Sequence, residues 1–364
     1  MTDNIFERLA ELLQSAGPVN WRLGVQIAES IAGAADPVEP WVAEEYEELG
    51  RTSAMLIGRS GALDPTPIPT LTVIDPRGWA AANLEGYAYL AEPLAAKFSG
   101  GGGMAQGMGI EQIFGQLAPA LVGLQVGSLV GTLARDLLGP FDAGLPPVSG
   151  GAASYAIVPN IEALAASELL DTRQTRLWAV MSEATHQALL AIPWVRGHLA
   201  DLAHDYISGL EMRPDQLQER LQSLGDPSDL ERLMSEPGGL TGFVAGPELD
   251  EVHDQLTALL AMLDGFGSAV VEEAGGALLP DLAGIRRAAT GRHPETELVI
   301  EQMLGIEIDA DLAEDARVFS ADIAVRWGND ARDRLWQAPG NLPTPAELGD
   351  PVGWAARVLL SDEL

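Results

Sequence analysis

Residues 177–186, LWAVMSEATH, are the stretch from which the rest of the chain is best interpreted. Glu183 and His186 occupy the last two defined positions of the pattern HExxH. That pattern places two imidazoles on one helix face to bind Zn²⁺, while the Glu between them serves as general base for a metal-bound water. The first position here is Ser182. A Glu followed three residues later by a His is common on helix surfaces, so this spacing alone is weak evidence for a metal site.

Helical periodicity dominates the chain on both sides of this stretch. The clearest helical runs are Trp21 to Ala34, Pro40 to Ile57, Gly78 to Phe98 and Pro247 to Glu273. Two short segments, Leu71 to Ile74 and Tyr155 to Val158, are β-branched or aromatic and are closed by turn residues, which favours strands. The pattern predicts a mainly α (α+β) protein with a small sheet.

The charge balance restricts the kinds of partner. Lys plus Arg number 21 and Asp plus Glu number 53, which gives a formal charge of −32. A chain this acidic is a poor candidate for binding nucleic acid or anionic membranes, because phosphate groups attract positive charge. The 47% of apolar residues supply material for a core, and the absence of Cys excludes disulfides and thiolate metal sites.

The N-terminal residues predict a short helix that packs on the body or on a partner. Ile5, Leu9, Leu12 and Leu13 share one helical face within residues 1–17. Acidic residues in that segment disfavour an export signal, so we expect a cytoplasmic protein. The division expected is this helix followed by a domain over residues 18–364. Within that domain, the glycine-rich residues 99–109 are expected to form a flexible loop.

One uncharged segment, Leu117 to Leu133, could form either a buried helix of the protein core or a membrane-spanning helix. It carries glycines at positions 123, 127 and 131, a spacing that lets helices approach closely in either environment. A membrane span needs about 20 predominantly apolar residues, and this run is shorter and includes Pro119 and Gln125. We therefore expect a buried helix and no membrane span.

Several blocks around the SEATH stretch resemble, in order, the zincin-like metalloprotease family of actinobacteria. That uncharacterised family is linked by name to biosynthesis of a deazaflavin coenzyme, a link for which the chain offers no residue-level support. The resemblance covers nearly the whole chain. Its blocks are GPVNW at 17–21, WAAANLEGYAYLAEP at 79–93, VGSLVG at 126–131, VPNIE at 158–162, SEATH at 182–186, PWVRGH at 193–198, residues 262–270 and WAARVLL at 354–360.

The resemblance implies a zincin-like fold, a helical body with a small sheet near the motif helix. It also implies zinc as the family's cofactor, Glu183 as the catalytic base, and His186 as a metal ligand. A downstream helix supplies an acidic ligand in the family, and the matching residue is Asp264. This chain departs from the family at both places: Ser182 replaces the first His, and Asp264 replaces Glu. An Asp-His pair that often follows in the family is Ser268-Ala269 here.

The two departures predict a weakened or absent zinc site. A neutral hydroxyl is a poor Zn²⁺ ligand compared with an imidazole. An Asp keeps the charge of a Glu but withdraws the carboxylate by one methylene, and catalytic geometry tolerates displacements of only about 1 Å. Possible substitute ligands are His198, His204 with Asp205, and His253, but none is spaced to replace position 182.

Two functional hypotheses remain open at this stage. The first is a catalytically impaired binding or regulatory module, which uses the cleft of the former active site to bind an unidentified peptide or protein. The second is a working zinc-dependent metallopeptidase, with Glu183 as base and with His186, Asp264 and a further group as ligands. Trp178 and Trp194 are expected to wall off the pocket. The basic pairs Arg286-Arg287 and Arg292-His293 are expected to pair with local carboxylates.

Overall fold

The structure, a computed structural model, describes residues 17–100, 110–142, 144–148, 153–212, 243–244, 249–290, 292, 300, 305–306 and 310–360. The predicted N-terminal helix, except for its last residue, and residues 101–109 of the predicted loop lie outside these ranges.

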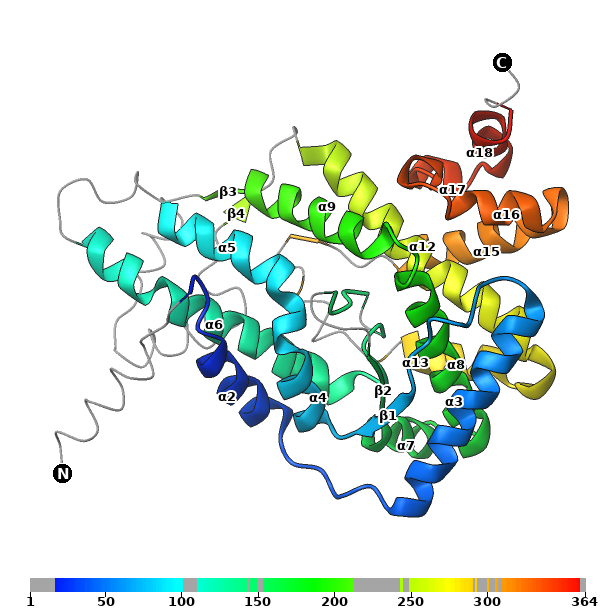
Figure 1. Cartoon of the computed structure of the whole chain (residues 1–364), viewed down its shortest axis with the longest axis horizontal. Coiled ribbons are helices and arrows are strands. Elements are labelled where there is room, and N and C mark those ends of the chain that lie inside the picture. The colour runs from blue at the N-terminus through cyan, green and yellow to red at the C-terminus, as the bar shows by residue number, and fades with distance from the viewer. Residues whose placement is uncertain are drawn as a thin grey trace.

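Helices make up most of the described chain (Figure 1). The α-helices are α2 Trp21–Ala32, α3 Pro40–Ser60, α4 Pro76–Asn83, α5 Ala88–Gly100, α6 Ile110–Asp136, α7 Val158–Ser167, α8 Thr172–Leu190, α9 Val195–Gly209, α12 Asp250–Gly275, α13 Leu282–Thr290, α15 Ala310–Trp327, α16 Asn329–Leu335, α17 Pro345–Leu348 and α18 Pro351–Val358. Short 3₁₀ turns lie at Leu84–Tyr87, Gly276–Leu278 and Pro339–Asn341.

Local capping residues explain where several helices begin. Asn20 accepts a hydrogen bond from the Leu23 N–H and starts α2. Asp171 caps the motif helix α8 by accepting the Gln174 N–H at 2.8 Å. Such side chains satisfy the backbone donors that the first helical turn leaves without partners. The start of the motif helix is therefore determined by the local sequence.

Two predicted strands pair in parallel to form the small sheet. Strand β1, Leu71–Ile74, pairs with β2, Ser154–Ile157, in the register Leu71 to Ser154 and Ile74 to Ile157. A parallel pair needs a long crossover, which α4, α5 and α6 supply here. Strand β2 lies against α8, so the predicted position of the sheet beside the motif helix is confirmed. A second, antiparallel pair joins β3, Glu211–Met212, to β4, Phe243–Val244.

The uncharged segment predicted as a buried helix forms most of α6 and packs along α2. A Cβ on Gly127 would lie 2.5 Å from the Gly24 carbonyl oxygen, so glycine is what allows the two backbones to approach. Within the described chain, Leu117–Asp136 is the stretch long and apolar enough to cross a membrane, but 78% of its most apolar 18-residue window is buried. The prediction of a buried core helix is confirmed.

The remaining differences from the sequence expectations are local. The run predicted over Gly78 to Phe98 is divided by the 3₁₀ turn Leu84–Tyr87 into α4 and α5. Strand β2 ends one residue early, because Val158 begins α7 with Pro159 behind it, and proline favours the first turn of a helix. Helix α5 extends through Gly100, two residues into the predicted loop.

Helices α8 and α12 pack against each other. Thirteen residues of α8 are buried, including Glu183 and His186. Helix α15 packs along α12, and the Cβ of Ala316 on α15 would lie 2.6 Å from a Cβ placed on Gly265. The small residues of α12 thus permit tight packing close to Asp264.

Candidate functional site

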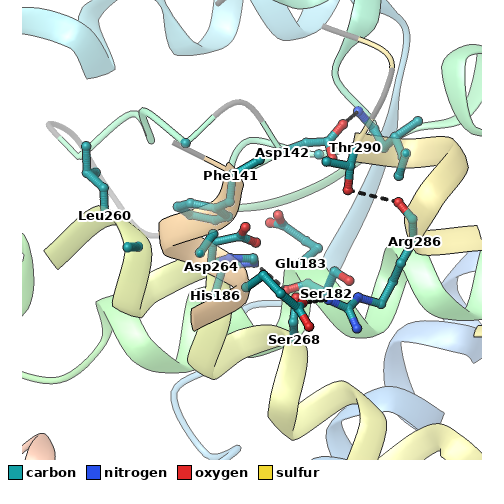
Figure 2. Close-up of a pocket in the computed structure, with 18 of the residues that line it drawn as sticks. Phe141, Asp142, Ser182, Glu183, His186, Leu260, Asp264, Ser268, Arg286 and Thr290 are labelled. Carbon is teal, nitrogen blue, oxygen red and sulfur yellow. Dashed lines mark hydrogen bonds and ion pairs between the residues drawn. The ribbon is translucent and has the colours of Figure 1, made fainter. Parts of the chain in front are cut away.

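The motif helix lines a cavity of about 380 Å³. Its walls come from α8, α12, α13, the first turn of α15 and the loop after α6, which lie far apart in the sequence (Figure 2). The polar and aromatic lining residues are Phe141, Asp142, Trp178, Ser182, Glu183, His186, Thr257, Asp264, Ser268, Arg286, Thr290, Asp311 and Glu314. A volume of this size is typical of a pocket for a small molecule or for a few side chains. The structure therefore brings together the residues singled out by the sequence, Ser182, Glu183, His186 and Asp264.

His186 is held in one orientation by two contacts. Its Nδ1 lies 2.8 Å from the Ser182 carbonyl oxygen. Because a carbonyl oxygen only accepts, Nδ1 donates, and a neutral ring keeps its lone pair on Nε2. The Phe141 ring stacks on the imidazole, with ring centroids 5.2 Å apart. Burial lowers the pKa of His186, although nearby Asp264 opposes that shift. A neutral imidazole is the form that binds a metal or accepts a proton.

Glu183 is a buried carboxyl group, with a relative exposure of 4%. Its Oε1 accepts hydrogen bonds from the Tyr155 N–H at 3.2 Å and from Gln187 Nε2 at 3.0 Å. Burial raises its pKa to about 8, against the opposing effect of these donors. A pKa near the working pH is suited to proton transfer, so the geometry retains the properties of a general base or acid.

Asp264 lies within the body of the protein, but its side chain is exposed to the cavity. Enclosure raises its pKa, His186 acts in the opposite direction, and repulsion from Asp142 adds to the increase. Figure 2 shows Asp264, His186 and Glu183 directed into the same space next to the Phe141 ring. The predicted acidic residue therefore faces the predicted His from the opposite helix.

Sequence reasoning missed the contributions of the loop after α6 and of α15. Phe141 and Asp142 follow α6 in the Gly- and Pro-rich sequence GPFDAG, a composition typical of a surface loop that carries functional residues. Asp142 Oδ2 accepts the Leu138 N–H at 3.0 Å, which fixes that loop. Asp311 and Glu314 carry no local signal that would have placed them at the site.

Other predicted residues lie elsewhere. His198 packs against Trp194, which stacks on Trp336, so Trp194 does not line the cavity as expected, whereas Trp178 does. The prediction for Trp194 is wrong because the turn at Pro193 directs it toward the C-terminal helices. His253 packs on the Tyr206 ring. Neither His198, His204 nor His253 is part of the cavity lining. Arg286 pairs with Glu314 at 2.7 Å, which confirms that prediction for this arginine.

Comparison with known proteins places this helical fold in a family. A sequence profile described as zincin-like metallopeptidase matches residues 19–355. The chain therefore belongs to the zincin-like metallopeptidase family. A solved structure from Chloroflexus aurantiacus, provisionally described as a hydrolase with a novel fold, matches with a TM-score of 0.66 and 24% identity. The match covers 93% of this chain and 98% of that one, and it supports the fold. Among curated proteins, none matches the sequence.

The family implies zinc, and the residues of this cavity do not fit a zinc site. Catalytic zinc sites use three protein ligands and keep a fourth position for water. Across the described ranges, no three His, Cys, Asp or Glu side chains lie together in a way that could hold a metal ion. His186 Nε2 and the Asp264 carboxylate are suitable donors, but Ser182 supplies only a hydroxyl where a third is needed.

Proposed function

We propose that this protein is a zincin-like metallopeptidase relative that has lost efficient zinc-dependent hydrolysis and binds a peptide or protein partner in the retained cleft. The observation that carries the proposal is the donor set around His186. His186 and Asp264 face each other across the cavity, but the His, Asp and Glu side chains of the described residues form no group of three that could hold a metal ion. A zincin that must activate water needs three such ligands.

The energetic argument supports weak metal binding. Zinc binding at a structural site contributes about 10–16 kcal/mol of free energy, and the loss of one strong ligand removes a substantial part of that binding energy. Asp264 cannot compensate, because it is shorter than Glu and approaches from α12, where the tight packing of Gly265 on α15 fixes the helix. The metal affinity left for two donors is too low for a resident cofactor.

The rest of the cleft is intact, which supports a binding role over simple decay. Glu183 remains buried and hydrogen-bonded, His186 remains oriented, and the cavity remains open to a ligand of modest size. Buried polar groups are costly to keep, so a cavity lined by them is a feature of binding sites more than of ordinary cores. The proposed place of action is the cytoplasm, supported by the burial of the apolar helix α6.

The competing function is an active zinc-dependent hydrolase completed by a further ligand. Zinc content of the purified, full-length protein separates the two, measured by elemental analysis after dialysis against a moderate zinc concentration. The variant Ser182→His restores the missing imidazole four residues before His186. Ser167→His, on an exposed position of α7 outside the cavity, is the matched control.

We expect wild type and Ser167→His to retain no stoichiometric zinc, and Ser182→His to retain about one equivalent. That result would support both the loss of metal and the assignment of the site. One tightly held zinc in wild type, removed by His186→Ala, would overturn the proposal in favour of an active hydrolase. Failure of folded Ser182→His to gain zinc would show that position 182 is not the lost ligand position.

A further inference from the structure

Arg332 of α16 is a buried arginine that lies outside the cavity lining, with a relative exposure of 3%. Its Nη1 donates to Glu273 Oε2 of α12 at 2.6 Å. The other two guanidinium nitrogens, Nε and Nη2, are buried and have no hydrogen-bond partner within the described part of the chain. We propose that this edge of Arg332 binds a small planar oxyanion of the carboxylate type. The proposal is independent of the cavity and goes beyond its proposed function.

Other arginines of this chain show what such an edge binds. Nε and Nη2 lie side by side in the guanidinium plane and donate in parallel, a geometry that matches the two oxygens of a carboxylate. Three arginines among the described residues use these two nitrogens to hold both oxygens of one glutamate. The pairs are Arg176 with Glu162, Arg317 with Glu314, and Arg357 with Glu347. Arg332 presents the same edge, but no side chain of the described residues accepts from it.

Burial makes an unpaired edge of a guanidinium unfavourable. Buried donors are almost always hydrogen-bonded, and a buried charge requires both a partner and satisfied hydrogen bonds. The ion pair with Glu273 supplies only part of this, because the Glu273 side chain is 46% exposed and solvent screens its charge. An oxyanion bound to Nε and Nη2 satisfies both donors at once.

A further buried donor lies on the same side of α16. Trp336 follows Arg332 by four residues, a spacing that places two side chains on one helix face. Its ring stacks on Trp194 with centroids 6.2 Å apart and meets Phe266 edge-on at 5.2 Å, so these contacts fix its orientation. Its Nε1 is buried and likewise has no partner in the described ranges. Buried donors without acceptors therefore gather on this side of the helix.

The enclosure limits the ligand to a few atoms. Nε and Nη2 of Arg332 have almost no contact with solvent, so a peptide segment cannot reach them in the folded protein. Two oxygens in one plane suit the paired N–H groups, whereas chloride offers a single atom to both. Formate and bicarbonate share the required chemistry. Entry requires a local opening, and the exposed side chain of Glu273 marks the side of the guanidinium that is nearest to solvent.

Thermal unfolding of the full-length protein tests the proposal with formate and bicarbonate as separate probes. Each anion replaces chloride stepwise at pH 8 and at constant ionic strength. We expect one or both to raise the Tm by about 2 °C at about 100 mM, because a ligand that binds only the folded state stabilises it. The anion that acts at the lower concentration is assigned as the preferred ligand.

Variants locate the binding. Arg332→Lys keeps a positive charge near Glu273 but removes the paired nitrogens, so it should abolish the rise in Tm. Arg357→Lys is the matched control. Because Arg357 already holds Glu347 with the same two nitrogens, this variant should keep the rise seen in wild type. If Arg332→Lys does not fold, NMR of wild type provides a second readout. The Arg332 Nε–H signal should shift as the anion is added.

A Tm that stays constant as formate and bicarbonate replace chloride would overturn the inference. So would an equal rise in wild type and Arg332→Lys, or an Arg332 Nε–H signal that does not move. A water molecule as the only acceptor on this edge would give these negative results. None of them bears on the loss of zinc, because neither Arg332 nor Trp336 belongs to the cavity lining.

Discussion

Glu183 accepts the backbone N–H of Tyr155 at 3.2 Å, so the carboxyl group of the motif helix is bonded directly to strand β2. The same group lines the cavity. Because its Oε1 accepts hydrogen bonds from Tyr155 and Gln187, the carboxyl group of Glu183 is held in one position by the fold. Its burial raises its pKa, and this makes its ionisation a property that stability measurements can detect.

Glu183→Gln tests that ionisation. The pKa of Glu183 is raised from 4.5 to about 8, so the folded protein holds a proton between these values that the unfolded chain releases. Stability from this group is therefore fully present below pH 4.5 and is lost as the pH rises through about 8. Relative to wild type, the variant should gain up to about 1.4 kcal/mol per pH unit across that window. Urea unfolding at several pH values measures the difference. A constant difference would show that Glu183 ionises normally.

Two glycines of α12 offer a matched pair of substitutions. A Cβ on Gly265 would meet backbone of α15, including the Ala313 carbonyl oxygen, whereas one on Gly267 would lie 3.4 Å from His186 Nε2, an ordinary contact. Gly265→Ala should destabilise by about 1–3 kcal/mol because the helices must separate. Gly267→Ala should be neutral or stabilise by up to about 1 kcal/mol through helix propensity. Chemical denaturation compares them, and equal effects would contradict the close approach of α15.

The ion pairs of Glu314 predict a local effect of acid. Hydrogen bonds from Arg317 and Arg286 lower the pKa of Glu314 to about 2. The contribution to stability is therefore present above pH 4.5 and is lost as the pH falls toward 2. Because the Glu314 side chain is 47% exposed, solvent screening limits that contribution to about 0–1 kcal/mol. An NMR titration should show a larger upward pKa shift in Arg317→Gln than in Arg286→Gln. The reverse order would show that Arg286 is the stronger partner.

The close packing of α2 on α6 predicts a strong effect at Gly127. Its Cβ would lie 2.5 Å from the Gly24 carbonyl oxygen, so Gly127→Ala should destabilise by about 1–3 kcal/mol. Gly197 is an exposed helical glycine of α9 with open space around it. Gly197→Ala should stabilise by up to about 1 kcal/mol. Thermal unfolding measures both, and a tolerated Gly127→Ala would show that the two helices can separate without cost.

The sequence alone predicted what local periodicity and capping decide. The principal helices, both strands of the parallel sheet and the burial of α6 were all predictable, because apolar spacing and turn residues act over a few neighbouring positions. The pairing of Glu183 with His186 on one helix was also predictable, since three residues make about one turn. The order of the family-like sequence blocks along the chain indicated the zincin-like family, and the match to the family profile confirms that membership.

Only the tertiary structure decided the composition of the cavity. Asp142, Asp311 and Glu314 reach it from a loop and from a helix distant in sequence, and no local pattern relates them to His186. The side chain of Trp194, predicted at the pocket, is directed away by the turn that precedes α9. The charge inside a cavity is the sum of the charges on side chains from all the helices and loops that line it, so it depends on how those elements pack. Sequence spacing describes one element at a time, and for that reason it revealed the motif but not the acidic site around it.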